Sequence, residues 1–144
     1  MSRSQRMKRI VSLNEVQKSV ASQQLSATRG RHAGNLQKLA EFHGYRHEYA
    51  RALQNPGQAM TAAAARDTRA FLGQLERTIN ALEAMVTRSE RECADDLMAW
   101  KREAQRANVL VDILGRCVRT EDADREGRLQ REIDDRRVEI ARIE

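Results

Sequence analysis

Apolar residues in the first third of the chain recur at steps of three and four. The series comprises Ile10, Leu13, Val16, Val20, Leu36, Leu39, Phe42, Tyr45, Tyr49 and Leu53. This spacing places the side chains on one helix face and predicts a helix over residues 5–54 that buries that face. Gly30 and Gly34 fall inside the pattern. Because an interior glycine costs about 1 kcal/mol relative to alanine, we expect the helix to be locally soft there.

The second part of the chain follows a seven-residue repeat. Its first apolar column is Leu72, Ile79, Val86, Cys93, Trp100, Ala107 and Leu114. A companion column begins as Leu75 and Leu82 and then moves one place over, to Leu97, Ala104, Val111 and Val118. A heptad seam sustained over this length predicts a coiled-coil helix over residues 61–143, with a shift of the flank near Cys93. Thr61 precedes an alanine run and is the expected N-cap.

Asn55-Pro56-Gly57 interrupts these two patterns and predicts a turn over residues 55–60. Two long helices joined by a short turn form an antiparallel pair. The sequence therefore predicts an all-α fold, a two-helix antiparallel coiled-coil hairpin occupying residues 1–144 as one domain. In this pairing Tyr45 falls opposite residues 71–75, and Trp100 falls opposite Val16 and Val20.

The last part of the second helix has no partner in this arrangement. Residues 119–144 are dominated by Arg, Glu and Asp, with a thin apolar stripe that includes Leu129 and Ile133. A single exposed helix buries little surface, so we expect this tail either to fray or to await a partner.

Composition agrees with long helices. Of the 144 residues 33% are charged and only 3% aromatic, with one proline, which argues against sandwiches, barrels and wound sheets. The chain lacks an apolar run long enough to span a membrane and an apolar signal segment, so we expect it in the cytoplasm. The net charge of +5 is concentrated near the N-terminus, where Arg3, Arg6, Lys8 and Arg9 cluster. Such a cluster is typical of a solvated helix end or of weak, non-specific nucleic-acid binding.

Signals for catalysis or cofactor binding are weak. His43 and His47 stand one helical turn apart, but no third ligand accompanies them in a zinc pattern. The chain contains no phosphate-binding glycine loop, nucleophile elbow or catalytic carboxylate pair. We therefore expect no catalytic residue, no metal, no cofactor and no small-molecule ligand, and predict that the protein is not an enzyme.

The order and spacing of several residues resemble the FliJ family, the small coiled-coil component of the flagellar type III protein export apparatus. The residues that carry this resemblance are Lys38, Leu39, Tyr45, Glu48, Tyr49, Phe71, Leu75, Ile79, Trp100, Arg102, Leu110 and Leu114. The similarity extends over roughly residues 7–119.

The resemblance implies a hairpin similar to the central stalk of rotary ATPases. It also implies three partners: the hexameric export ATPase, the cytoplasmic domain of the export-gate membrane protein, and the export chaperones. The partner-binding residues it implies are Tyr45, Tyr49, Phe71, Leu75, Thr78 and Leu82. Arg3, Arg6 and Arg9 are candidate contacts to the ATPase ring. The resemblance further implies peripheral association with the inner membrane at the export apparatus. The alternative function is a general coiled-coil scaffold or a weak nucleic-acid-binding protein.

Overall fold

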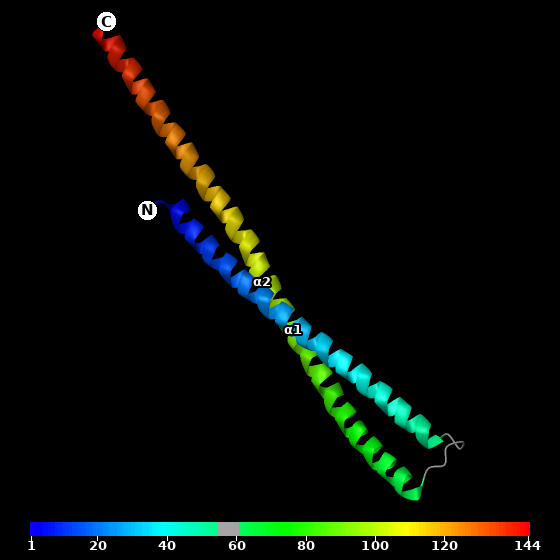
Figure 1. The fold of residues 1–144 in the computed structure, drawn as a ribbon. Helices are drawn as coiled ribbons and strands as arrows, with labels where there is room; N and C mark the ends of the chain where they lie inside the picture. Colours follow the sequence, from blue (N-terminus) through cyan, green and yellow to red (C-terminus); the bar gives the residue numbers. More distant parts are fainter. Residues whose placement is uncertain (55–60) are drawn as a thin grey trace. The chain divides into compact units, whose positions relative to one another are not determined.

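Two long helices account for nearly all of the structure, a computed structural model that describes residues 1–54 and 61–144 (Figure 1). Helix α1 runs over Arg3–Gln54 and helix α2 over Ala62–Ile143, and the described residues contain no strand. The two helices pack against each other, which confirms the predicted all-α hairpin. The turn expected at residues 55–60 lies outside the described residues. None of the helices in the described part of the chain is long and apolar enough to cross a membrane.

Side-chain caps define the start of each helix. The Ser2 hydroxyl accepts a hydrogen bond from the Gln5 backbone N–H at 3.2 Å, and the Gln5 side chain accepts one from the Ser2 N–H at 3.1 Å. This reciprocal pair is a capping box, which satisfies N–H groups that the first turn leaves unpaired. At α2 the Thr61 hydroxyl accepts from the Ala64 N–H at 3.1 Å, so the predicted N-cap is confirmed.

The contacts divide the chain into two compact units. The first unit contains Met1–Ala21 with Trp100–Glu144, and the second contains Ser22–Ala99. Both units pair a segment of α1 with a segment of α2. In the first unit, Ser4 contacts Glu121 and Asn14 contacts Glu103.

In the second unit, Thr28, His32 and Tyr49 contact Asp96, Ser89 and Phe71 respectively. In each unit the partner's residue number falls as the number on α1 rises. The helices are therefore antiparallel in both units.

The buried face of α1 matches the predicted series only in part. Leu39, Phe42 and Leu53 are half-buried, as expected. Ile10, Leu13, Val16, Val20 and Leu36 are exposed, as are Tyr45 and Tyr49. The α1 positions that face α2 form two unbroken heptad columns: Ser4, Val11, Lys18, Leu25, His32, Leu39, Arg46 and Leu53, with Met7, Asn14, Ala21, Thr28, Asn35, Phe42 and Tyr49. These side chains are buried or half-buried, apart from Tyr49. The prediction of an Ile10–Val20 seam was wrong because many of the inward positions hold polar residues, which an apolar periodicity does not register.

On α2 the first predicted column is buried or half-buried throughout, from Leu72 to Leu114. The second column does not shift near Cys93 as predicted. It continues in unbroken sevens as Leu75, Leu82, Ser89, Asp96, Glu103, Leu110 and Cys117, all buried or half-buried. Three consecutive members of this column are polar, and the neighbouring apolar residues gave the false impression of a shift.

The charged segment after Arg119 remains helical to Ile143. Its apolar residues Leu129, Ile133, Val138, Ile140 and Ile143 are all exposed. In the first unit the buried side chains therefore end near Glu121, opposite the start of α1.

Candidate partner-binding surface

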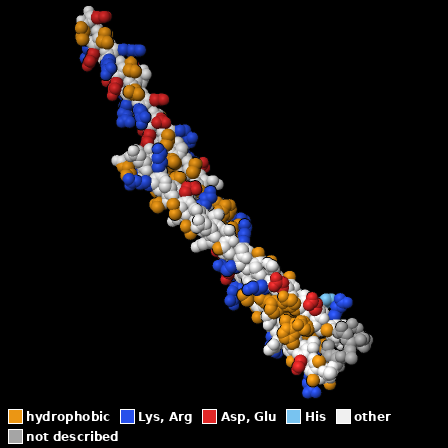
Figure 2. Space-filling view, in the orientation of Figure 1, with side chains coloured by type: hydrophobic (Ala, Val, Ile, Leu, Met, Phe, Trp, Pro, Cys, Tyr) orange, Lys and Arg blue, Asp and Glu red, His pale blue; other side chains and the backbone are white. Residues whose placement is uncertain are grey.

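Aromatic side chains from both helices meet in the second unit. The Tyr49 and Phe71 rings pack edge to face, with centroids 4.8 Å apart and an interplanar angle of 66°. On α1, Phe42 and Tyr45 form a similar pair with centroids 5.6 Å apart. Tyr45, Tyr49 and Phe71 nevertheless stay exposed, Phe71 by 41% of its surface. Figure 2 shows hydrophobic atoms gathered over this part of the molecule. Exposed aromatic rings held by one another are suited to bind a protein partner.

The remaining predicted partner-binding residues lie on α2 at different depths. Leu75 and Leu82 are buried in the seam together with Ile79, which is 1% exposed. Thr78 is exposed. The structure thus brings Tyr45, Tyr49, Phe71 and Thr78 to the surface of the second unit, and it places Leu75 and Leu82 in the core of that unit.

His43 and His47, the two histidines weighed as zinc ligands, have separate environments. His43 Nε2 lies 4.0 Å from a carboxylate oxygen of Glu83 on α2, and His43 Nδ1 lies 3.0 Å from an Arg46 guanidinium nitrogen. His47 is exposed. Across residues 1–54 and 61–144, no group of three or more His, Cys, Asp or Glu side chains is placed to hold a metal ion.

The N-terminal arginines lie in the first unit. Arg3, Arg6 and Arg9 are all exposed. Beside them, the carboxylate of Glu121 on α2 accepts two hydrogen bonds from Ser4, one from the hydroxyl at 2.6 Å and one from the backbone N–H at 3.0 Å. These bonds, together with the more distant charges of Arg125 and Lys8, hold the pKa of Glu121 below its usual value. The Glu121 carboxylate is therefore already engaged with the first turn of α1, the turn that contains Arg3 and Arg6.

A set of polar contacts across the seam was missed at the sequence level. Asn14 Nδ2 donates to Glu103 at 2.9 Å, the Thr28 hydroxyl donates to Asp96 at 2.5 Å, and His32 Nδ1 lies 2.7 Å from the Ser89 hydroxyl. Each pair joins an inward position of α1 to the polar stretch of the second column of α2. The signal that could have found them is the continuation of the Leu75–Leu82 column by sevens into Ser89, Asp96 and Glu103.

Comparison with known families agrees with this architecture. The family model described as "Flagellar FliJ protein" matches residues 3–142, almost the full length of the chain. The chain belongs to the FliJ family. Membership of this family implies a protein related to flagellar export. No curated protein and no solved structure matches the chain at a significant level.

The FliJ-family match includes both helices and the aromatic residues. The match extends beyond residues 7–119, over which the sequence resembles the family, and reaches the charged tail of α2. The match therefore includes the N-terminal arginines and most of the charged tail.

Proposed function

We propose that this protein is a non-enzymatic component of the flagellar type III export apparatus that binds and stimulates the export ATPase ring. It couples the ring to the cytoplasmic domain of the export gate and to the export chaperones. The observation that carries the proposal is the FliJ-family match over residues 3–142 of a two-helix hairpin. A coiled coil acts by contact with other proteins, so stimulation would come from bridging neighbouring ATPase subunits.

The proposed partner-binding surface consists of Tyr45, Tyr49, Phe71 and Thr78, which we assign to the gate protein and the chaperones. Their exposure and the Tyr49–Phe71 edge-to-face contact support this assignment. Aromatic anchors contribute most of the binding energy in many protein interfaces. Leu75 and Leu82 lie beneath this surface. Their buried side chains pack against α1 and so keep the part of α2 that carries Phe71 and Thr78 in place.

The proposed ATPase contacts are Arg3, Arg6 and Arg9. Their exposed guanidinium groups can pair with carboxylates on the ring, and their position at the start of a capped helix keeps them in a fixed arrangement. The protein would work in the cytoplasm, peripherally associated with the inner membrane at the export apparatus.

Measurement of ATP hydrolysis and oligomerisation by the purified export ATPase, with and without this protein, tests the proposal. At low salt the protein should raise both. A variant with Arg3, Arg6 and Arg9 changed to Gln should lose the effect, whereas a variant with Arg66, Arg69 and Arg77 changed to Gln should keep it. The second set is also exposed and removes the same charge. If the wild-type protein changes neither property, the proposed function is wrong.

A further inference from the structure

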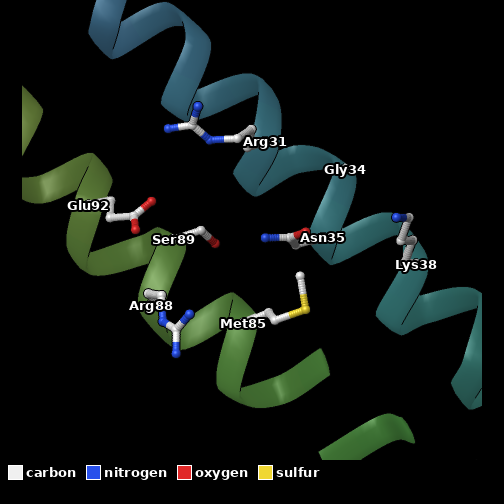
Figure 3. Close-up of a pocket in the computed structure, with 8 residues that line it drawn as sticks. All are labelled: Arg31, Gly34, Asn35, Lys38, Met85, Arg88, Ser89 and Glu92. Carbon is white, nitrogen blue, oxygen red and sulfur yellow. The ribbon is translucent and has the colours of Figure 1, made fainter. Parts of the chain in front are cut away.

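A groove of about 390 Å³ lies between α1 and α2 in the second unit, away from the aromatic residues (Figure 3). Its lining comprises Arg31, Gly34, Asn35, Lys38, Met85, Arg88, Ser89 and Glu92. In the close-up, Asn35 of α1 and Ser89 of α2 point toward each other across the gap. The seam side chains here are short and polar, so they leave the space between the helices incompletely filled.

Three cations of the groove have no acidic partner among the described residues. Within residues 1–54 and 61–144, Arg31, Lys38 and Arg88 make no ion pair at 4.0 Å or less. Arg31 makes a long hydrogen bond of 3.4 Å to the Thr28 hydroxyl. Glu92 is the one acidic residue of the lining, so the groove carries a net positive charge. A cluster of exposed cations around a concave surface attracts a complementary negative group.

Gly34 opens the α1 wall of the groove. A Cβ at this position would meet no atom within 4 Å, so packing within the chain does not require a glycine there. A glycine in a helix interior costs about 1 kcal/mol relative to alanine, but it lets another backbone approach closely. Across the groove the Met85 side chain is 45% exposed and offers an apolar contact.

We propose that this groove docks an acidic amphipathic helix of a partner protein. The partner backbone crosses α1 at Gly34, an apolar side chain packs on Met85, and carboxylates pair with Arg31, Lys38 and Arg88. Charge complementarity favours an acidic partner, and the exposed Met85 side chain favours a peptide over a bare phosphate chain. Glu92 adds repulsion against a uniformly negative ligand. The site is separate from the Phe71 surface and does not depend on the proposed function.

The test uses the full-length protein and a fluorescent synthetic helix of about 20 residues, which spans about 30 Å. The peptide carries Glu on one face, with Ala and Leu elsewhere, and binding is followed by fluorescence anisotropy at 0.15 M salt. Gly34→Leu should weaken binding at least tenfold because the added side chain fills the groove. Gly44→Leu is the matched control, because Gly44 is also interior to α1 and open at Cβ but does not line the groove. Both changes should raise helix stability similarly, which circular dichroism checks.

A second variant pair separates charge from shape. Lys38→Gln combined with Arg88→Gln should weaken peptide binding at least tenfold, whereas Arg91→Gln combined with Lys101→Gln should leave it within twofold. Equal effects of the groove and control variants, or no peptide binding by the wild type, would overturn the proposal. Tighter binding of a short single-stranded RNA than of the peptide, lost in Gly34→Leu, would also overturn it, because the groove would then be a nucleic-acid site.

Discussion

Glu121 of α2 binds the first turn of α1 through both oxygens of its carboxylate, which accept the Ser4 backbone N–H at 3.0 Å and the Ser4 hydroxyl at 2.6 Å. The first-turn N–H groups of a helix lack partners within the helix and carry its positive dipole end. An anionic group from the opposite helix therefore caps α1 and fixes the register of the first unit at the same time.

The Ser4–Glu121 contact should make the first unit sensitive to acid. The folded pKa of Glu121 is lowered, chiefly by the Ser4 hydroxyl bond, so the folded state holds its proton less tightly than the unfolded chain does. The contact therefore stabilises the fold above the ordinary glutamate pKa, and this contribution is lost as the pH falls through the folded value. Nuclear magnetic resonance of the Ser4 amide, followed against pH, should show a transition below the usual glutamate range.

Two variants control this titration. In Glu121→Gln the Ser4 amide should lose the transition, and the acid-dependent part of the unfolding free energy should shrink. Glu126→Gln removes an exposed carboxylate nearby on α2 and should leave the transition in place. A Ser4 transition that persists in Glu121→Gln would show that another group controls it.

The Asn14–Glu103 pair should limit stability and specify the pairing. Asn14 is 3% exposed, and its Oδ1 has no partner among the described residues. Replacing a buried polar pair by packed apolar residues is often stabilising, whereas removing one partner leaves the other buried without a hydrogen bond. Asn14→Leu combined with Glu103→Leu should therefore raise the free energy of unfolding by about 1–3 kcal/mol. Asn14→Leu alone should gain less than the double variant.

Urea unfolding measures these stabilities, and spin-label distances between the helices measure the register. The double variant should show a broader distance distribution, because a buried polar pair is matched at one register only. A double variant less stable than the wild type would contradict this account of the seam.

The fold could be predicted from the sequence because its signals are local and redundant. The heptad of α2 from Leu72 to Leu114 and the Thr61 cap each identify a helix without reference to its partner. The face of α1 could not be predicted in the same way. Its inward positions include Asn14 and Thr28, whose burial depends on Glu103 and Asp96 far along the chain. Between Ile10 and Leu36, hydrophobic periodicity instead selected a stripe that faces solvent.

The candidate site was predictable only in part for a related reason. The heptad position of Phe71, next to the Leu72 column, indicates the edge of the seam, and Phe71 is indeed exposed. The heptad columns also contain Leu75 and Leu82, which are buried. The family resemblance grouped these residues with Phe71, whereas the heptad spacing by itself places Leu75 and Leu82 in the core and Phe71 at its edge. The groove at Gly34 has no sequence motif, because it arises from short side chains contributed by two helices.

Truncation of Phe71 should separate binding from folding. Phe71→Ala loses an edge-to-face contact with Tyr49, worth about 0.5–1.5 kcal/mol, and should keep the helicity of the wild type. It should weaken binding to the gate domain by about 2 kcal/mol or more. Ile79→Ala, which opens a cavity at a fully buried position, should cost about 2–5 kcal/mol of unfolding free energy. Isothermal titration and thermal unfolding give the two quantities, and loss of the fold in Phe71→Ala would place Phe71 in the core.

The exposed apolar stripe of α1, which consists of Ile10, Leu13, Val16 and Val20, should be dispensable for folding. Leu13 is 66% exposed and Val16 is also exposed, so Leu13→Gln combined with Val16→Gln should change the free energy of unfolding by less than about 1 kcal/mol. Leu25→Ala, at a buried position of the same helix, should cost about 2–5 kcal/mol. Urea unfolding compares the two. A large loss of stability in the Gln variant would mean that this stripe is packed in solution.

Salt dependence should distinguish a protein-binding role from nucleic-acid binding at the basic N-terminus. Arg3, Arg6, Lys8 and Arg9 allow about four phosphate contacts, and each contributes about −0.9 to the slope of log K against log salt on duplex DNA. Raising salt from about 0.05 M to about 0.15 M should then weaken DNA binding by about 50-fold. Binding through the aromatic surface should change little, because burial of apolar area is not screened by ions. Electrophoretic mobility shifts and gate-domain titrations at both salt concentrations test this difference, and sequence-selective DNA binding that survives at about 0.15 M would favour nucleic acid as the partner.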